Sequence, residues 1–175
     1  MIDFPEERFP SVGRRTDQAF FADRTERPLT LRGVTVADLP ELLRVDRDAF
    51  PEEPYTQVVL RQLVDIHGDR ILVLDDGESL LAYVLFVNTS DGYASWIMSL
   101  AVTPHQRGRG LGRRLMVEAL RRLRTEHVHQ VRLTVEPTNA TAIMLYRSMG
   151  FSSDEGVEKD YFGPGEDRLI MTLAM

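Results

Sequence analysis

The chain has 175 residues, of which 43% are hydrophobic and 27% are charged, a balance typical of one globular domain with a sizeable core. No apolar run approaches the roughly 20 residues that a membrane span requires, and cysteine is absent, which excludes disulfides and thiolate nucleophiles. The N-terminus has acids in place of an apolar core and does not resemble a secretory signal, so we expect a cytoplasmic protein that does not bind membranes.

Charge is distributed unevenly along the chain. The net charge of −6 argues against a general nucleic-acid binder, and no aromatic residue interleaves with the Arg-rich segment between Thr103 and Gln130. Residues 107–124 contain seven Arg and one Glu, whereas residues 46–53 contain four acids and one Arg. Residues 154–168 contain six acids and two bases. One basic segment therefore stands between two acidic ones, and we expect no nucleic-acid partner.

The N-terminal part of the chain is predicted to be irregular. Residues 1–28 lack periodicity and contain three Pro, which predicts an extension ahead of a single domain over residues 29–175. The alternating residues 29–34 predict the first strand. Amphipathic helices are expected next, over about 35–50 and 56–67.

The middle of the chain predicts three strands. Residues 70–88 predict two strands joined by a turn at Asp75–Gly77. Residues 93–102 form a nearly continuous apolar run that Pro104 ends, which predicts a central strand buried on both faces.

The C-terminal third predicts a helix, a strand, a helix and a hairpin. The helix has Leu111, Leu115, Ala119 and Leu123 along one stripe. The later elements are expected at 127–135, 138–150, 151–162 and 167–175. A strand–helix–strand crossover implies a parallel pair inside an otherwise antiparallel sheet, so the fold class is α+β with helices flanking a mixed sheet.

The stretch "QRGRGLGRR" joins the apolar strand to the helix at residues 106–114. Such a turn leaves main-chain N–H groups unpaired at a helix N-terminus, where the helix dipole favours an anion. Glycines without Cβ atoms permit close approach and unusual dihedrals, and arginines add charged contacts. A diphosphate fits best. The P-loop is excluded because its Lys is missing, and the Rossmann fingerprint because the glycines have the wrong spacing. A Gly-rich turn with a solvated Arg face is the remaining alternative.

Together with a second motif, this stretch resembles the GNAT superfamily of N-acetyltransferases. The family's cofactor motif, Q/R-x-x-G-x-G/A, matches from Arg107 to Gly112, with Val102 and Pro104 just before it. The second motif, N-x-x-A-x-x-L-Y-x-x-x-G-F, is met at every fixed position of "NATAIMLYRSMGF", which begins at Asn139. The resemblance covers about residues 29–175. It implies acetyl-CoA as cofactor and direct transfer to an amine.

The resemblance also implies a site. The parallel strands are expected to splay apart around the cofactor, so that Leu100 and Val102 pair with the pantetheine arm and an N–H near Leu100 polarises the thioester carbonyl. Asn139 would bond the pantetheine, and Tyr146 would be the general acid, because a phenol with a pKa near 10 is protonated at neutral pH. A Tyr that only packs at the interface is the alternative. The implied cofactor-binding residues are Leu100, Ala101, Val102, Arg107, Gly108, Arg109, Gly110, Leu111, Gly112, Arg113, Asn139, Ala142 and Tyr146.

The general base is open. In the branch that acetylates protein N-termini, a Glu often precedes the Tyr by twelve residues, and Thr134 stands there in this chain. Glu136, at the end of that strand, is included with Tyr146 and Leu100 as a catalytic candidate. Acids of the loop after the first helix are further candidates: Asp48, Glu52 and Glu53.

The acceptor is predicted to be a cationic primary amine, because the acidic segments are free to attract it. The stretch "EKDYFGPGEDRLIMTL" resembles the closing hairpin of protein N-terminal acetyltransferases, which favours a protein or peptide N-terminus or lysine. The implied acceptor-binding residues are Glu52, Glu53, Tyr55 and Tyr161, with Phe162 beside the last. A polyamine, an aminoglycoside or a catalytically silent acyl-CoA-binding module are alternatives. His127 and His129 have no third ligand nearby, so no metal is expected. The oligomeric state, monomer or homodimer, is open.

Overall fold

The structure is a computed structural model that describes residues 28–153 and 156–175, so the predicted N-terminal extension lies almost entirely outside the described residues. Its strands form one seven-stranded sheet in the order β1-β2-β3-β4-β5-β7-β6. The strands are β1 (Thr30–Gly33), β2 (Ile71–Asp75), β3 (Leu80–Asn88), β4 (Ala94–Val102), β5 (Gln130–Val135), β6 (Val157–Glu158) and β7 (Arg168–Ala174). The α-helices are α1 (Leu39–Ala49), α2 (Gln57–His67), α3 (Leu111–Thr125) and α4 (Ala140–Arg147).

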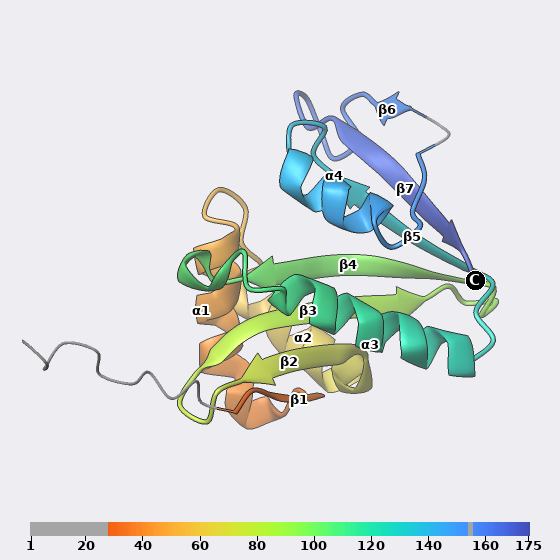
Figure 1. The fold of residues 1–175 in the computed structure, drawn as a ribbon. Helices are drawn as coiled ribbons and strands as arrows, with labels where there is room; N and C mark the ends of the chain where they lie inside the picture. The colour runs from red at the N-terminus through yellow and green to blue at the C-terminus, as the bar shows by residue number, and fades with distance from the viewer. Residues whose placement is uncertain (1–27, 154–155) are drawn as a thin grey trace, which may run out of the picture.

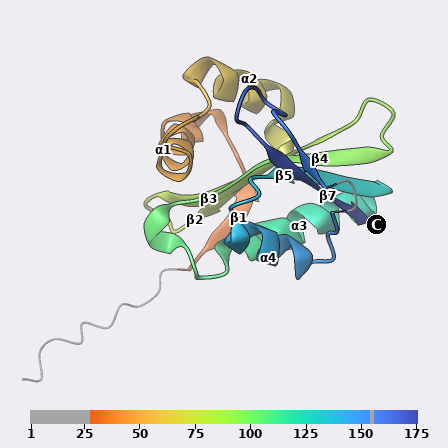
Figure 2. The ribbon, with the colours of Figure 1, turned by 90° about the horizontal axis from the view of Figure 1, so that it is seen from above.

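Helices cover both faces of this sheet. Helices α1 and α2 lie on one face, and α3 and α4 lie on the other (Figures 1 and 2). Each face has its own buried apolar cluster, and α3 contributes the expected stripe of Leu111, Leu115, Ala119 and Leu123. None of the helices in the described part of the chain has both the length and the apolar character needed to cross a bilayer.

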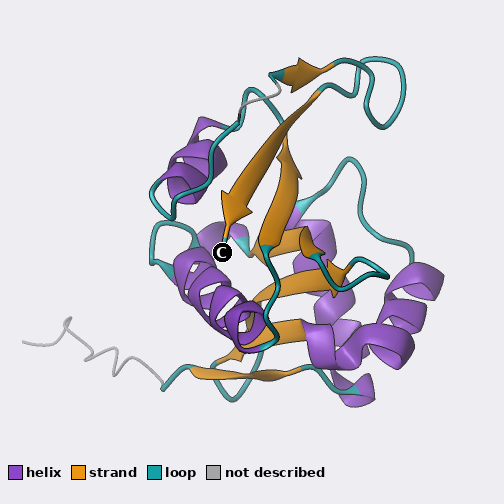
Figure 3. Ribbon diagram, turned by 90° about the vertical axis from the view of Figure 1, so that its right-hand side faces the viewer, coloured by secondary structure: helices purple, strands orange, loops and turns teal. Residues whose placement is uncertain are grey.

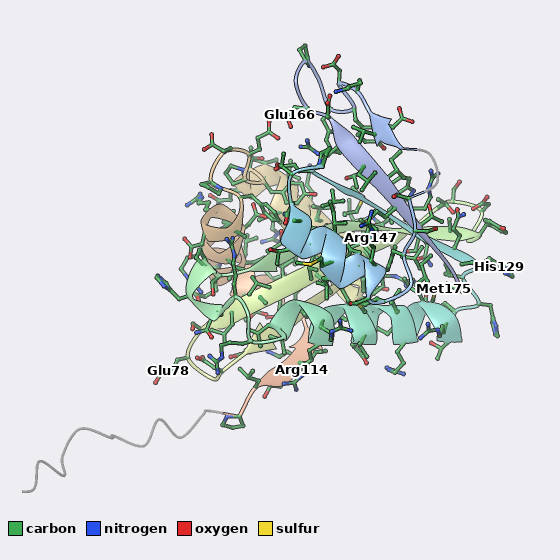
Figure 4. The ribbon with its side chains drawn as sticks, turned by 45° about the horizontal axis from the view of Figure 1, so that its top comes forward. Glu78, Arg114, His129, Arg147, Glu166 and Met175 are labelled. Atoms are coloured by element: carbon green, nitrogen blue, oxygen red, sulfur yellow. The ribbon has the colours of Figure 1, made fainter. Side chains whose placement is uncertain are left out.

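The parallel pair of strands splays apart as expected. Strands β4 and β5 pair only from Ala94 with Gln130 to Ile97 with Leu133, although β4 continues to Val102. Beyond that point β5 pairs with β7 alone. Strands β5 and β7 consequently stand away from the rest of the sheet (Figure 3). At the closed end the Met175 N–H donates to the carbonyl of His129, 3.0 Å away, and both residues lie at one edge of the molecule (Figure 4).

The second half of β4 is not buried on both faces, and that prediction was wrong. A register shift in the β3–β4 pairing sets Leu85 opposite Ser99 and Phe86 opposite Ile97, which leaves Met98 as an extra residue. Met98 is 52% exposed. The apolar run could not show this, because the exposure comes from the departure of β5 and from the bulge.

Two C-terminal elements are also shorter than predicted. The strand expected from His127 begins at Gln130, because His127 adopts φ 59° in the turn that follows α3. The first strand of the closing hairpin is limited to Val157–Glu158, with an isolated bridge between Ser152 and Thr172. Pairing partners, which the sequence pattern does not show, decide where these strands begin and end.

An ion-pair cluster fixes the start of the first helical segment. Thr35 and Asp38 form the capping box of a short 3₁₀ turn that leads into α1. The guanidinium of Arg32 lies 2.7 Å from Asp38 and 2.6 Å from Asp75, which joins β1 and β2 to this turn. Hydrogen bonding to Arg32 lowers the pKa of Asp38 to about 2.

Candidate active site

The turn between β4 and α3 has the backbone that the glycine spacing predicted. Gly108 and Gly110 have φ of 77° and 76°, a region that residues with a Cβ seldom adopt. Within residues 28–153 and 156–175, no atom lies within 4 Å of the position that a Cβ would take at either glycine. Gly110 is the N-cap of α3, and no side chain caps this end. The first N–H groups of α3 therefore face open space and can bind an anion.

The three arginines of the turn are exposed and differ in their contacts. The Nε of Arg107 donates to the carbonyl of Val102, 3.3 Å away, and Arg109 bonds the side chain of Gln106. Arg113 donates to the hydroxyl of Ser148, at the end of α4. Arg107 and Arg109 thus border the turn, whereas Arg113 joins the start of α3 to the end of α4.

Gly112 is where β4, α3 and α4 meet. A Cβ built there would lie 3.6 Å from Leu145 and 3.7 Å from Leu100 and Val102. These are ordinary contacts, so the position requires a small residue rather than a special backbone angle. The close packing fixes the start of α3 against both sides of the splay.

The end of β4 presents main-chain groups to the gap between the strands. The N–H of Thr103 donates to the carbonyl of Leu81, 3.0 Å away, and so points toward β3. Because polar groups alternate along a strand, those of Leu100 and Val102 point away from β3, toward the side that β5 has left. Ala101 and Leu111 have buried side chains that pack in the core, so these two can contribute only main-chain atoms.

Helix α4 lies on the same face of the sheet as α3, and with its cap it contains most of the motif that begins at Asn139. The side chain of Asn139 accepts from the N–H of Ala142, 3.1 Å away, and so caps the helix. Tyr146 is only 7% exposed, and its ring lies 5.9 Å from that of Phe151. Burial raises the pKa of Tyr146 to about 12, so the phenol is fully protonated at neutral pH.

The proposed acceptor residues occupy two loops that flank the open end of the splay (Figure 1). Glu52 and Glu53 are exposed in the loop between α1 and α2, and Tyr55 is half-buried at its end. In the loop between β6 and β7, the rings of Tyr161 and Phe162 pack edge to face with centroids 4.7 Å apart. These two loops therefore contain two exposed carboxylates and a pair of packed aromatic rings.

Glu136 is exposed just beyond β5 and precedes the cap of α4. Its carbonyl accepts from the N–H of Asn139, 3.0 Å away. Across the described ranges, no three His, Asp or Glu side chains gather into a group that could hold a metal ion.

A buried polar chain of three residues was missed in the sequence. The carboxylate of Asp46 on α1 accepts from the hydroxyl of Tyr83 on β3, 2.5 Å away, and this hydroxyl lies 2.9 Å from that of Ser99 on β4. Asp46 is 0% exposed and Tyr83 is 1% exposed. An acid within the apolar stripe of α1 and a Tyr within the apolar strand "LLAYVLF" were visible, but their contact joins residues 37 positions apart.

Comparison with known proteins finds relatives that are named as acetyltransferases. An N-alpha-acetyltransferase of Sulfolobus acidocaldarius is 28% identical over 156 residues, which cover 83% of this chain and 92% of that protein. The [ribosomal protein bS18]-alanine N-acetyltransferase of Escherichia coli is 27% identical over 151 residues, or 82% of this chain and 96% of that protein. A mycothiol acetyltransferase of Beutenbergia cavernae is 42% identical, but over 81 residues that span 46% of this chain and 27% of the relative.

Solved structures and a family model agree with this result. The crystal structure of the ribosomal-protein-S18-alanine N-acetyltransferase from Escherichia coli matches with a TM-score of 0.72 at 25% identity, over 84% of this chain and 94% of that one. The model of the Acetyltransferase (GNAT) family matches residues 37–151, which include the Gly-rich turn and α4. With this match over more than half of its length, the chain belongs to the GNAT family of acetyltransferases.

Proposed function

We propose that this acetyltransferase transfers the acetyl group of acetyl-CoA to a cationic primary amine, with a protein or peptide N-terminus or a lysine favoured. The observation that supports this most is the splay of β5 from β4, because the two loops at its open end contain a pair of aromatic rings and two exposed carboxylates. The ammonium group of a peptide that binds between these two loops would be attracted to the carboxylates.

The residues of the turn fit the cofactor that the family uses. Gly108 and Gly110 leave room for a diphosphate at the N-terminus of α3, with Arg107 and Arg109 at its border. The main-chain groups of Leu100 and Val102 can hydrogen-bond the pantetheine amides. Bound acetyl-CoA supplies an acetyl thioester, whose carbonyl carbon the amine attacks and whose leaving thiolate must be protonated.

Tyr146 is suited to donate that proton. Its pKa of about 12 keeps the hydroxyl protonated, and the buried ring of α4 faces the same side of the sheet as Leu100. The N–H of Leu100, which faces the gap, is our candidate for stabilising the oxyanion.

The names of the relatives support an N-terminal acceptor. Two relatives that match over nearly their whole length are an N-alpha-acetyltransferase and an alanine N-acetyltransferase of a ribosomal protein. The mycothiol acetyltransferase, whose acceptor is a small molecule by its name, matches only over about a quarter of its length.

An acceptor screen tests the proposal. The purified chain is incubated with acetyl-CoA and with peptides, free lysine, polyamines or amino sugars, and released thiol and acetylated product are both measured. We expect a peptide acceptor to give the highest kcat/KM, and the Tyr146→Phe variant to report the background. A neutral or anionic preferred acceptor, or a small amine preferred over every peptide, would contradict it.

A further inference from the structure

We propose that Asp46, Tyr83 and Ser99 form a proton relay that draws a proton from the acceptor amine. The relay rests on the proposed function only in that the acceptor is an amine. It supplies the base that the sequence did not identify.

Three elements from two layers build the chain of hydrogen bonds. Asp46 comes from the last turn of α1, Tyr83 from the middle of β3 and Ser99 from β4. The Tyr83 hydroxyl donates to Asp46 at 2.5 Å, and the Ser99 hydroxyl lies 2.9 Å from it. The contact with the carboxylate has the short distance of a charge-assisted O–H···O⁻ bond, and the contact between the two hydroxyls is an ordinary O–H···O bond. A proton can therefore pass along the chain by hops between adjacent oxygens, with no water between them.

The chemistry of the buried end suits a proton acceptor. Burial raises the pKa of Asp46 toward neutral pH. Hydrogen bonds from Tyr83 and from the N–H of Tyr55 stabilise its anion. The charge of Arg47, the next residue on α1, also lowers the pKa of Asp46. The pKa of Tyr83 is raised well above 10 by its burial and by Asp46, with Ser99 acting in the opposite sense. Tyr83 therefore passes a proton on without resting as a phenolate.

The outer end of the relay lies beside the atoms where transfer is expected. Ser99 directly precedes Leu100, in the half of β4 that β5 has left. Tyr83 and Ala101 pack in the cluster beneath α1 and α2, whereas the Leu100 side chain packs in the cluster beneath α3 and α4. The Ser99 hydroxyl, bonded to Tyr83, thus lies on the face opposite to Tyr146. That is the face of α1 and α2, whose connecting loop contains Glu52 and Glu53.

An ammonium acceptor loses two protons when it becomes an amide. An ammonium acceptor gives one proton to the Ser99 oxygen, Ser99 passes its own to Tyr83, and Tyr83 passes its own to Asp46, which becomes a neutral acid. The free amine then forms the C–N bond as the C–S bond breaks. The second amine proton replaces the one that Tyr146 gives to the sulfur. Asp46 later returns its proton to solvent by the same chain.

Three variants interrupt or preserve the path. Tyr83→Phe deletes the central hydroxyl and keeps the ring, Ser99→Ala deletes the outer one, and Ser99→Thr restores it. Ser95→Ala is the matched control, because Ser95 is also buried on β4 and its hydroxyl bonds, among the described residues, the carbonyl of Val87, 3.2 Å away. Thermal unfolding and calorimetric binding of acetyl-CoA are measured for each, so that folding and cofactor binding are assessed apart from turnover.

We expect kcat with a peptide acceptor at pH 7 to fall roughly 10- to 100-fold in Tyr83→Phe and in Ser99→Ala. The double variant should be no slower than either single one, since both interrupt one path. Ser99→Thr and Ser95→Ala should retain most of the activity. Acetyl-CoA affinity should not change in any of them.

The pH dependence separates a relay from a structural role. A peptide α-amine has a pKa of about 8, so at about pH 9 it is mostly neutral in solution and no longer needs the relay. The decrease in kcat caused by Tyr83→Phe should then shrink to a few-fold. A lysine acceptor, with a pKa of about 10.4, should keep the defect.

Two results would overturn the relay. One is a folded Tyr83→Phe or Ser99→Ala enzyme with nearly wild-type kcat at pH 7, above all if Glu136→Gln is inactive. The other is a defect that is equal at pH 7 and pH 9. If the wild type acetylates a polyamine or an amino sugar but no peptide, the proposed function fails, and the same variants are measured on that amine.

Discussion

Substitution of Gly110 separates the charge of the anion site from its shape. At φ 76°, Asp and Asn are among the better-tolerated replacements, and their side chains are almost equal in size. In the part of the chain that the structure describes, no atom lies within 4 Å of a Cβ built there, so neither side chain clashes with those residues. We therefore expect Gly110→Asn and Gly110→Asp to lower the free energy of unfolding by a similar amount, about 1 kcal/mol.

Cofactor binding should distinguish the two variants. A carboxylate about 4 Å from one phosphate charge costs about 1 kcal/mol in water and about 4 kcal/mol at an effective dielectric constant of 20. Because Gly110 lies at the surface, the lower part of this range applies to each charge of a diphosphate. Gly110→Asp should weaken acetyl-CoA binding by at least about 2 kcal/mol, or roughly 30-fold in Kd. Gly110→Asn should cost less than about tenfold.

Calorimetry at low and high salt measures both effects. The difference between the Asp and Asn variants should shrink as salt rises, since exposed charges are screened. Gly77→Asp is the control, because Gly77 has φ 88° and an equally open Cβ position in the turn between β2 and β3. It should lose similar stability and bind acetyl-CoA normally. Equal affinity of the two Gly110 variants in folded protein would refute a diphosphate at this turn.

Four further predictions follow from other residues. Tyr146→Phe should lower kcat on the order of 10- to 1000-fold with little change in acetyl-CoA Kd, which stopped-flow turnover and calorimetry would check. Gly112→Ala should fold and bind normally in thermal unfolding and calorimetry, because its Cβ would lie no closer than 3.6 Å to any atom. Changing Glu52 and Glu53 together to Gln should raise only the acceptor KM, several-fold, and less so in high salt. The folded-state pKa of Asp38, about 2, lies below its ordinary 3.8 because of its arginine partner, so its contribution to stability is present above about pH 4 and is lost toward pH 2. Asp38→Asn should therefore flatten acid unfolding in that window.

Most of the fold was predictable because its local patterns agree with its pairing. The α3 stripe and the β2–β3 turn at Gly77 are both where the sequence predicts them. Errors arose where distant partners decide the outcome. Met98 is exposed because β5 leaves β4, and β6 is short because only two of its residues pair with β7.

The candidate site divides in the same way. Gly108 and Gly110 were identifiable because a turn of that geometry requires glycine, and the structure shows the predicted dihedral angles. The contact of Arg113 with Ser148 was not predictable, since it depends on how α3 and α4 pack. In the sequence Asp46 was counted only as one of the four acids of residues 46–53, and the structure shows it to be buried against Tyr83.

The relay and the proposed acid lie on opposite faces of the sheet, and the splay is what allows both to reach one point. Paired strands would separate Tyr146, on α4, from Ser99, which lies on the face of α1. Because β5 does not pair with β4 beyond Ile97, this edge of β4 is left without β5 between the two faces of the sheet. An amine arriving from the side of α1 can then lose a proton to Ser99, while the sulfur on the other side takes one from Tyr146. Loss of the Tyr83 hydroxyl should therefore affect the amine and not the leaving thiol, so its defect should grow with the basicity of the acceptor. The decrease in kcat caused by loss of the Tyr146 hydroxyl should be equal for weakly and strongly basic amines at a pH where both are neutral. The ratio of the decrease in Tyr83→Phe to that in Tyr146→Phe, measured across such acceptors, tests whether the two residues act on different protons.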